Sequence, residues 1–280
     1  MGCDGTLIKP VIPVILLEEI DVPFSETEEG ELDLTQEGAH SVPRIIHAGD
    51  ATGRAIELSL LNRVRNEPNV TLATEVTAVD LLTTHHHPTD IQVRYRLANE
   101  CVGAYLLDNQ TKDVYTIFAD YTVLATGGIG QIYLHSTNTR NAIGDGVVMA
   151  QRAGVRIMNS EYVQFHPTAL ADKKANHFLI SEALRGEGAR LRNQNGEYFM
   201  EKYSPDLKDL APRDIVARAI VEEMTTYKHE FVYLDLANFY TGHQPIAERF
   251  PNIYKACQEI GVDIEHEAIP VVPAAHYFCG

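Results

Sequence analysis

The sequence has few cysteines and no long apolar run. Its 280 residues include four cysteines, and no two of them form a C-x-x-C pair. This spacing indicates neither a disulfide framework nor a zinc site, so we expect a reduced, cytoplasmic protein. No apolar run reaches the roughly 18–20 residues that a membrane-spanning helix needs. The apolar stretch Val11–Leu17 is short, is interrupted by Pro13 and follows no basic segment, so we expect no signal peptide.

Positive charge is scarce as well. The chain has 23 Lys and Arg against 39 Asp and Glu, which gives a formal net charge of −16. This balance argues against general binding to nucleic acid or to an anionic membrane surface. A local cluster of Arg and His can still bind an anionic small molecule. The length and the 45% hydrophobic content are those of a globular protein with one large domain or two smaller ones.

The most informative stretch is Leu210–Ile220, which has the pattern of a helix start. Pro212 suits the first helical turn, and Asp214 suits the positive end of the helix dipole. Apolar residues then recur at helical spacing, namely Ile215, Val216, Ala219 and Ile220. Arg213 therefore lies at the start of a helix, and its permanent charge suits a carboxylate or phosphate. A surface arginine paired with Asp214 or Asp209 is the alternative, and this stretch alone leaves both open.

Two glycine-containing segments indicate a nucleotide-type ligand. A predicted strand ends in A-T-G-G at 125–128, where glycine lets the backbone approach a ligand closely. Gly128-Ile129-Gly130 is by itself a weak dinucleotide signal, because it lacks a third glycine and a suitably placed acid. Gly144-Asp145-Gly146 opens a predicted helix through Ala153, whose N–H groups suit a phosphate or another polar cofactor group. A simple Asp N-cap explains that segment equally well.

The remaining pattern predicts alternating helices and strands. We expect helices over 51–64 and 246–260, the second divided at Pro251, and strands over 70–82, 91–105, 113–124 and 231–236. The three histidines His85–His87 suggest a metal site at first sight. Adjacent histidines on an extended loop point in different directions, however, so a solvated turn is the better interpretation.

Five polar residues from separate segments form a candidate site: His166, Ser181, Glu182, Arg213 and His276. Each of them, taken alone, is more often structural than catalytic. Together, two histidines, an arginine and a hydroxyl would suit a dicarboxylate, because cationic and hydroxyl donors form charge-assisted hydrogen bonds with carboxylate oxygens. The sequence does not show that they converge.

A resemblance to a known family supplies that link. The chain resembles the flavoprotein family of succinate dehydrogenases, fumarate reductases and L-aspartate oxidases, from about Leu17 to Gly280. The matching motifs, in family order, are A-T-G-G at 125–128, G-D-G at 144–146, Q-F-H-P-T at 164–168, Glu182 with R-G-E-G at 185–188, and Arg213-Asp214. Three details resemble the L-aspartate oxidases within this family: Pro212 before the arginine, P-A-A-H-Y at 273–277, and Glu37.

The resemblance implies an FAD-dependent oxidation of L-aspartate to iminoaspartate, the first step of de novo NAD biosynthesis through quinolinate. A hydride passes from the substrate Cα to flavin N5, and oxygen or fumarate reoxidises the flavin. Quinolinate synthase is the implied partner. Arg213 matches the proton-transfer residue, and Glu37 matches an acid that meets the substrate's amino group. Matches to the substrate site are His166, Ser181, Glu182 and His276, of which Glu182 better suits orienting Arg213 or a neighbouring donor. Matches to FAD-contacting positions are Thr77, Ala78, Thr126, Gly127 and Asp145.

The implied fold is an incomplete α/β FAD-binding domain of glutathione-reductase type with an inserted α+β capping domain. We expect the FAD-binding domain over 1–158, the capping domain over 159–275 and a return to the first domain over 276–280. Family members begin with a strand–G-x-G-x-x-G–helix unit and continue beyond the equivalent of Gly280, so we expect an internal fragment. Two alternatives remain open: a fumarate reductase or succinate dehydrogenase flavoprotein, and a non-catalytic dicarboxylate-binding remnant.

Overall fold

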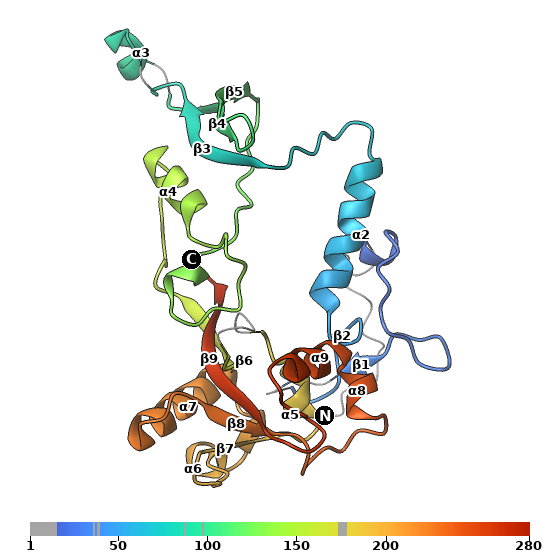
Figure 1. Cartoon of the computed structure of the whole chain (residues 1–280). Helices are drawn as coiled ribbons and strands as arrows, with labels where there is room; N and C mark the ends of the chain where they lie inside the picture. Colours follow the sequence, from blue (N-terminus) through green and yellow to red (C-terminus); the bar gives the residue numbers. More distant parts are fainter. Residues whose placement is uncertain (1–15, 36, 38–39, 87, 97, 173–177) are drawn as a thin grey trace, which may run out of the picture. The chain divides into compact units, whose positions relative to one another are not determined.

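A computed structural model describes residues 16–280 apart from 36, 38–39, 87, 97 and 173–177. The expectations for the first fifteen residues and for His87 therefore lie outside the described residues. The chain forms two compact units, which Figure 1 traces along the sequence. Unit 1 contains Met1–Leu72, Ile180–Pro212 and Val232–Pro270, and unit 2 contains Ala73–Leu179, Arg213–Phe231 and Val271–Gly280. The expected domain boundaries at 158 and 275 stay a prediction.

Unit 1 combines two short antiparallel strand pairs with short helices. Its strands are β1 (Leu34–Thr35), β2 (Ile45–Ile46), β7 (Arg190–Arg192) and β8 (Val232–Asp235). Its helices are α2 (Thr52–Asn66), α5 (Ala183–Gly186), α6 (Met200–Tyr203), η2 (Lys208–Leu210), α8 (Ile246–Arg249) and α9 (Pro251–Glu259). β1 pairs with β2 and β7 with β8, and Leu191, Leu234 and Ile253 from β7, β8 and α9 are at most 1% exposed. Burying such side chains stabilises the fold by about 1.5–3 kcal/mol each.

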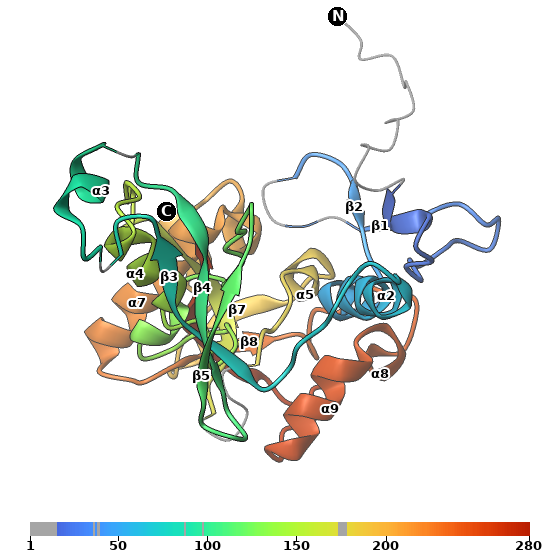
Figure 2. The ribbon, with the colours of Figure 1, turned by 90° about the horizontal axis from the view of Figure 1, so that it is seen from above.

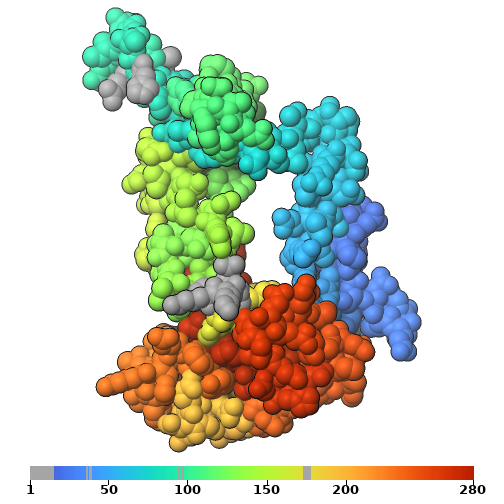
Figure 3. All heavy atoms as spheres, in the orientation of Figure 1, coloured from blue at the N-terminus to red at the C-terminus, as the bar shows by residue number. Residues whose placement is uncertain are grey.

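Helix α2 confirms the helix expected over 51–64, although none of its residues is buried. Leu58 and Leu60 are 55% and 45% exposed, and Figure 3 shows the helix in light blue with its side chains at the surface. Apolar residues at helical spacing therefore predicted the helix correctly, but these residues are not buried.

Unit 2 contains a three-stranded antiparallel sheet in the order β3–β4–β5, visible in Figure 2. The strands are β3 (Val76–Thr83), β4 (Cys101–Asp108) and β5 (Val114–Phe118), and helix α4 (Asp145–Arg152) contacts β3. A salt bridge links the two elements, because Arg152 Nε on α4 lies 3.0 Å from Asp80 Oδ2 on β3. Gly103 in β4 has a φ of +149°, and a Cβ there would overlap the carbonyl oxygen of Ile117. Glycine therefore permits the close pairing of β4 with β5.

A second pair of strands in unit 2 places most of the candidate site. β6 (Val163–Leu170) runs antiparallel to β9 (Ile269–Phe278), with His166 opposite Ala274. Helix α7 (Arg213–Tyr227) packs against β6. The predicted helix start is confirmed, because α7 begins directly after Pro212. The break expected near Pro251 is also confirmed, since α8 and α9 are separate helices with Pro251 at the start of α9.

The strand prediction differs from the structure in three places. Residues 91–96 form the short helix α3 (Ile91–Arg96), because the Asp90 carboxylate accepts a 2.8 Å hydrogen bond from the N–H of Gln92 and caps it. The run 121–124 forms no strand among the described residues, and its Tyr121 and Val123 are 90% and 86% exposed. A β-branched or aromatic run forms a strand only where another strand can hydrogen-bond to it. The strand expected from residue 70 begins only at Val76.

The described cysteines should differ sharply in reactivity. Cys257 on α9 is fully buried, and burial raises the pKa of its thiol to about 12, whereas Cys101 and Cys279 are exposed. Because the thiolate is the nucleophile, iodoacetamide at mildly alkaline pH should alkylate Cys101 and Cys279 and leave Cys257 unmodified until urea is added. Peptide mass spectrometry measures all three thiols in one sample. Equal labelling of Cys257 in the native chain would contradict its burial.

Candidate functional site

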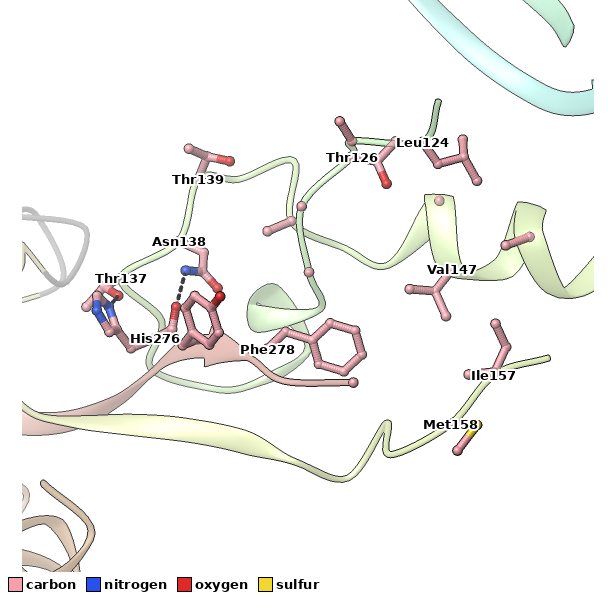
Figure 4. Close-up of a pocket in the computed structure, with 18 of the residues that line it drawn as sticks. Leu124, Thr126, Thr137, Asn138, Thr139, Val147, Ile157, Met158, His276 and Phe278 are labelled. Atoms are coloured by element: carbon pink, nitrogen blue, oxygen red, sulfur yellow. Dashed lines mark hydrogen bonds between the residues drawn. The ribbon is translucent and has the colours of Figure 1, made fainter. Parts of the chain in front are cut away.

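A cavity of about 810 Å³ lies within unit 2 (Figure 4). Its walls come from residues 124–128, residues 137–139, the first turns of α4, residues 156–158 and the end of β9. Threonine and asparagine side chains and backbone line one part, while Val147, Ile157 and Phe278 line another. A volume of this size is within the range of roughly 300–1,000 Å³ typical of small-molecule and cofactor sites.

Glycines let the cavity wall take its shape. Gly127 has a φ of +74°, a conformation that residues with a Cβ rarely adopt. A Cβ on Gly146 would overlap the Thr126 hydroxyl, and a Cβ on Gly128 would overlap the Phe278 side chain. Gly144, with a φ of +86°, turns the chain into the N-terminus of α4. Close backbone approach and the N–H groups of a helix start suit a phosphate-bearing dinucleotide, so the residues present fit FAD.

The five predicted FAD-contacting residues do not all line this cavity. Thr126 and Gly127 do. Asp145 is exposed outside the lining, and its carboxylate accepts a 2.9 Å hydrogen bond from the N–H of Gly146. Thr77 and Ala78 are exposed on β3, where the Thr77 hydroxyl bonds the Asn109 side chain at 3.0–3.2 Å. The structure therefore brings two of the five to the cavity, and the FAD roles of all five stay predictions.

His166 and His276 lie together in unit 2, because β6 and β9 pair. Their ring centroids are 5.2 Å apart, with the rings inclined by 63°. His166 is 1% exposed, and its Nδ1 accepts a hydrogen bond of 3.2 Å from the backbone N–H of Thr168. A ring nitrogen that accepts a hydrogen bond carries no proton, so neutral His166 bears its proton on Nε2. The pairing of two strands thus unites two imidazoles that are far apart in the sequence.

Arg213, the first residue of α7, has the expected place at a helix start. It is half-buried, and its guanidinium donates a 3.3 Å hydrogen bond to Oε1 of Gln164 on β6. The two acids that sequence reasoning offered as its partners have other cations beside them. Asp214 forms a salt bridge with Arg218, and Asp209 lies 3.7 Å from Arg190. The positive charge of Arg213 also lowers the pKa of His276.

The pKa of His276 is lowered from its ordinary value of 6.5, first by burial and then by the positive charge of Arg213. Below pH 6.5 the unfolded chain therefore binds a proton that the folded chain does not. This histidine should make the free energy of unfolding fall as the pH drops from 6.5 toward its folded pKa, and should have no such effect above 6.5. Urea titrations between pH 5 and 8 should show a shallower acid-side slope for His276→Gln. An unchanged slope would contradict this account.

Glu182 lies in unit 1 as part of a buried ion pair. Its carboxylate accepts a 2.8 Å hydrogen bond from Arg185, and the two side chains are 3% and 0% exposed. Arg185 also donates to the backbone carbonyl of Asp209 at 2.6 Å. Burial raises the pKa of the Asp209 carboxyl, although that carboxyl accepts a 2.7 Å hydrogen bond from the N–H of Leu191. The geometry gives Glu182 a cationic partner on its own helical turn, Arg185.

Glu37 and Ser181 line one small cavity of about 80 Å³ in unit 1, together with His47 and Arg249. The Ser181 hydroxyl accepts a 3.2 Å hydrogen bond from the N–H of Ala183, which places it at the start of α5. Two candidates predicted from separate segments thus share a cavity. Its wall contains a carboxylate, a hydroxyl, an imidazole and a guanidinium.

Sequence reasoning missed two residues beside His276. Thr137 and Asn138 both line the unit 2 cavity, and both hydrogen-bond to His276. Neither belongs to a motif or a periodic pattern, so no signal in the sequence marked them. Gln164 and Arg185 were part of matching motifs, but nothing in the sequence showed that they contact Arg213 and Glu182.

Comparison with known proteins places this geometry in a family. The family model described as "FAD binding domain" matches residues 13–280. The chain belongs to this FAD-binding flavoprotein family. The predicted FAD-binding α/β fold is thereby confirmed, and FAD is the cofactor of the family.

Among the described residues, no helix is both long and apolar enough to cross a membrane.

Curated relatives narrow the resemblance. The chain is 47% identical to L-aspartate oxidase of Pseudomonas aeruginosa over 274 residues, which cover 94% of this chain and 48% of that protein. It is 43% identical to the chloroplastic L-aspartate oxidase of Arabidopsis thaliana, covering 92% of this chain and 39% of that one. The chain therefore spans about half the length, or less, of the curated relatives it matches.

Solved structures agree on the fold. The FrdA chain of Escherichia coli quinol fumarate reductase superposes with a TM-score of 0.80 at 29% identity, covering 95% of this chain and 45% of that chain. The Sdh1 complex of Mycobacterium smegmatis gives a TM-score of 0.67 at 31% identity, covering 95% and 44%. The resemblance inferred from the motifs, to flavoproteins of this family and most closely to L-aspartate oxidases, is confirmed.

Proposed function

We propose that this chain carries the catalytic chemistry of an L-aspartate oxidase, converting L-aspartate to iminoaspartate with FAD bound in the unit 2 cavity. The observation that best supports the proposal is the pair His166 and His276, held 5.2 Å apart beside that cavity with Arg213 acting on one of them. The identity of 42–48% to named L-aspartate oxidases over more than nine-tenths of the chain supports the same substrate.

FAD, when bound, would supply two-electron oxidation, with oxygen or fumarate as the final electron acceptor. Thr126, Gly127 and the start of α4 would hold it, because their glycines let the backbone approach a ligand closely.

The chain's own residues bind and orient the substrate and move its protons. Neutral His166 carries its proton on Nε2, and an N–H group of this kind suits a carboxylate oxygen. Arg213, at the start of α7, neutralises negative charge and takes part in proton transfer. An arginine with a pKa above about 12 needs an electropositive setting for that role, and its hydrogen bond to Gln164 fixes its direction. The roles that the resemblance implies for Glu37 and Ser181, toward the substrate's amino group and a carboxylate, belong to residues of unit 1 and stay predictions.

The product, an imine of a dicarboxylate, leads toward quinolinate and NAD, so quinolinate synthase is the proposed consumer. The scarcity of cysteine and the lack of a C-x-x-C pair favour a reducing, cytoplasmic setting for this reaction.

The proposal is tested by loading the chain with FAD and adding substrate in the absence of oxygen. L-aspartate should bleach the visible flavin band, and air should restore it. Bleaching by succinate instead of L-aspartate would favour a succinate dehydrogenase or fumarate reductase activity. Dicarboxylate binding by a chain that takes up no flavin would favour a non-catalytic remnant.

A single added methyl group should weaken FAD binding. In Gly146→Ala the new Cβ meets the Thr126 hydroxyl in the cavity wall, and overpacking of this kind costs about 1–3 kcal/mol. We therefore expect FAD affinity, measured by flavin fluorescence titration, to fall by roughly tenfold or more. Gly53→Ala on α2 is the matched control, since a Cβ there meets nothing within 4 Å. Equal affinity of the two variants would contradict the proposed cavity.

A further inference from the structure

Thr137 and Asn138 hold His276 at its side chain and at its backbone. The Thr137 hydroxyl lies 2.8 Å from His276 Nδ1, and the Asn138 side-chain amide donates a 2.8 Å hydrogen bond to the His276 carbonyl (Figure 4). The backbone N–H of Thr137 also donates to the carbonyl of Ala275 at 3.0 Å. Two consecutive residues outside β9 thus make two hydrogen bonds to His276 and a third to the residue before it, Ala275.

The segment that carries these two residues is itself firmly placed. Ser136 is 5% exposed, and its hydroxyl accepts a 3.2 Å hydrogen bond from the N–H of Asn138. Gln131 donates to the Asn138 carbonyl at 2.8 Å. A Cβ on Gly130 would overlap Asn138 Oδ1 and lie 2.8 Å from Ser136 Oγ, so glycine is required there. The contact between Thr137 and His276 is therefore part of a packed arrangement.

The Thr137 hydroxyl has two possible hydrogen-bond acceptors, which differ in distance. The Thr137 hydroxyl can donate to His276 Nδ1 at 2.8 Å or to the Ala275 carbonyl at 3.4 Å. Hydroxyl donors prefer separations of about 2.7–2.8 Å, and the Ala275 carbonyl already accepts the backbone N–H of Thr137. The shorter separation favours donation by the hydroxyl to Nδ1, the arrangement in which the neutral imidazole carries its proton on Nε2.

We propose that Thr137 is a positioning residue that fixes His276 in the Nε2–H tautomer, so that His276 presents an N–H donor to a carboxylate-bearing ligand at the cavity. The backbone N–H of Thr168 hydrogen-bonds to Nδ1 of His166, and the Thr137 hydroxyl hydrogen-bonds to Nδ1 of His276. The carboxylate ligand rests on the proposed function, whereas the tautomer rests on the geometry alone.

The tautomer is tested in the full-length chain by NMR of ¹⁵N-labelled histidine, with His276 assigned from its loss in His276→Gln. In the wild type, Nε2 should have the chemical shift of a protonated nitrogen and Nδ1 that of an unprotonated acceptor. Thr137→Val keeps the shape and loses the donor, so His276 should move toward the other tautomer. Thr137→Ser should restore the wild-type pattern. His166 should not change in either variant, because its donor is a backbone group.

Ligand binding is measured separately with fumarate, by titrating the histidine resonances in the same samples. Thr137→Val should weaken fumarate binding by about tenfold or more, as expected for the loss of a hydrogen bond to a charged group, and Thr137→Ser should bind nearly as well as the wild type. An unchanged His276 tautomer in Thr137→Val, or equal fumarate affinity with a changed tautomer, would overturn the proposal. Neither measurement requires oxidation of L-aspartate, so failure of the proposed reaction would be seen independently.

Discussion

Replacing Arg213 by glutamine is expected to slow the oxidation of L-aspartate by about 10²–10⁴-fold, the contribution typical of a positioned proton-transfer group. Glutamine keeps hydrogen-bonding capacity but loses the permanent charge and the planar fork of five donors. The loss should appear mainly in kcat, measured by steady-state kinetics with saturating FAD. Because the charge of Arg213 lowers the pKa of His276, the same variant should also raise that pKa.

A matched control lies on the same helix. Arg218 is another arginine of α7, but its side chain is 75% exposed and pairs with Asp214. Such exposed pairs contribute about 0–1 kcal/mol, so Arg218→Gln should keep both the rate and the stability close to the wild type. Equal activity of Arg213→Gln and Arg218→Gln would show that Arg213 is a structural residue.

Replacing Arg185 by methionine should have the largest effect on stability. The substitution leaves the Glu182 carboxylate buried without its 2.8 Å partner and removes the hydrogen bond to the Asp209 carbonyl. Breaking one side of a buried ion pair typically costs 3–5 kcal/mol, so we expect a loss of about that size in the free energy of unfolding. Urea denaturation followed by circular dichroism measures it.

The control for this prediction is an ion pair of similar length at the surface. Arg152 and Asp80 are 3.0 Å apart, with side chains 52% and 22% exposed. Arg152→Met should therefore cost less than about 1 kcal/mol. The double variant Arg185→Met with Glu182→Gln should recover part of the stability lost by Arg185→Met, since no charge is then left buried alone. Equal losses for the Arg185 and Arg152 variants would contradict the role given to burial.

Local signals in the sequence were sufficient for the main helices. α2, α4 and α7 each follow from apolar spacing and from the residues at their starts, and Pro251 divides α8 from α9 as expected. These features depend on neighbours within a few residues. The wrong strand prediction at 121–124 depended on a partner strand elsewhere in the chain, whereas the one at 91–96 overlooked the local cap at Asp90. Alternation of apolar residues does not reveal whether a second strand is available for pairing.

The candidate site shows the same limit. The resemblance identified His166 and His276, but their proximity arises from the pairing of β6 with β9, which no local pattern encodes. Thr137 contacts His276 through a single 2.8 Å hydrogen bond from its hydroxyl, and nothing in the sequence distinguishes this threonine from the others. Sequence thus predicted which motif residues to consider, while the fold was needed to find the groups that orient them.

The most direct test of this account is the flavin content of the purified chain. The chain is incubated with FAD and desalted, and its visible spectrum is recorded together with its protein concentration. The account predicts a retained flavin band that corresponds to about one FAD per chain and that disappears when L-aspartate is added without oxygen. A folded but colourless protein would contradict the assignment of the unit 2 cavity as the FAD site, and with it the proposed reaction.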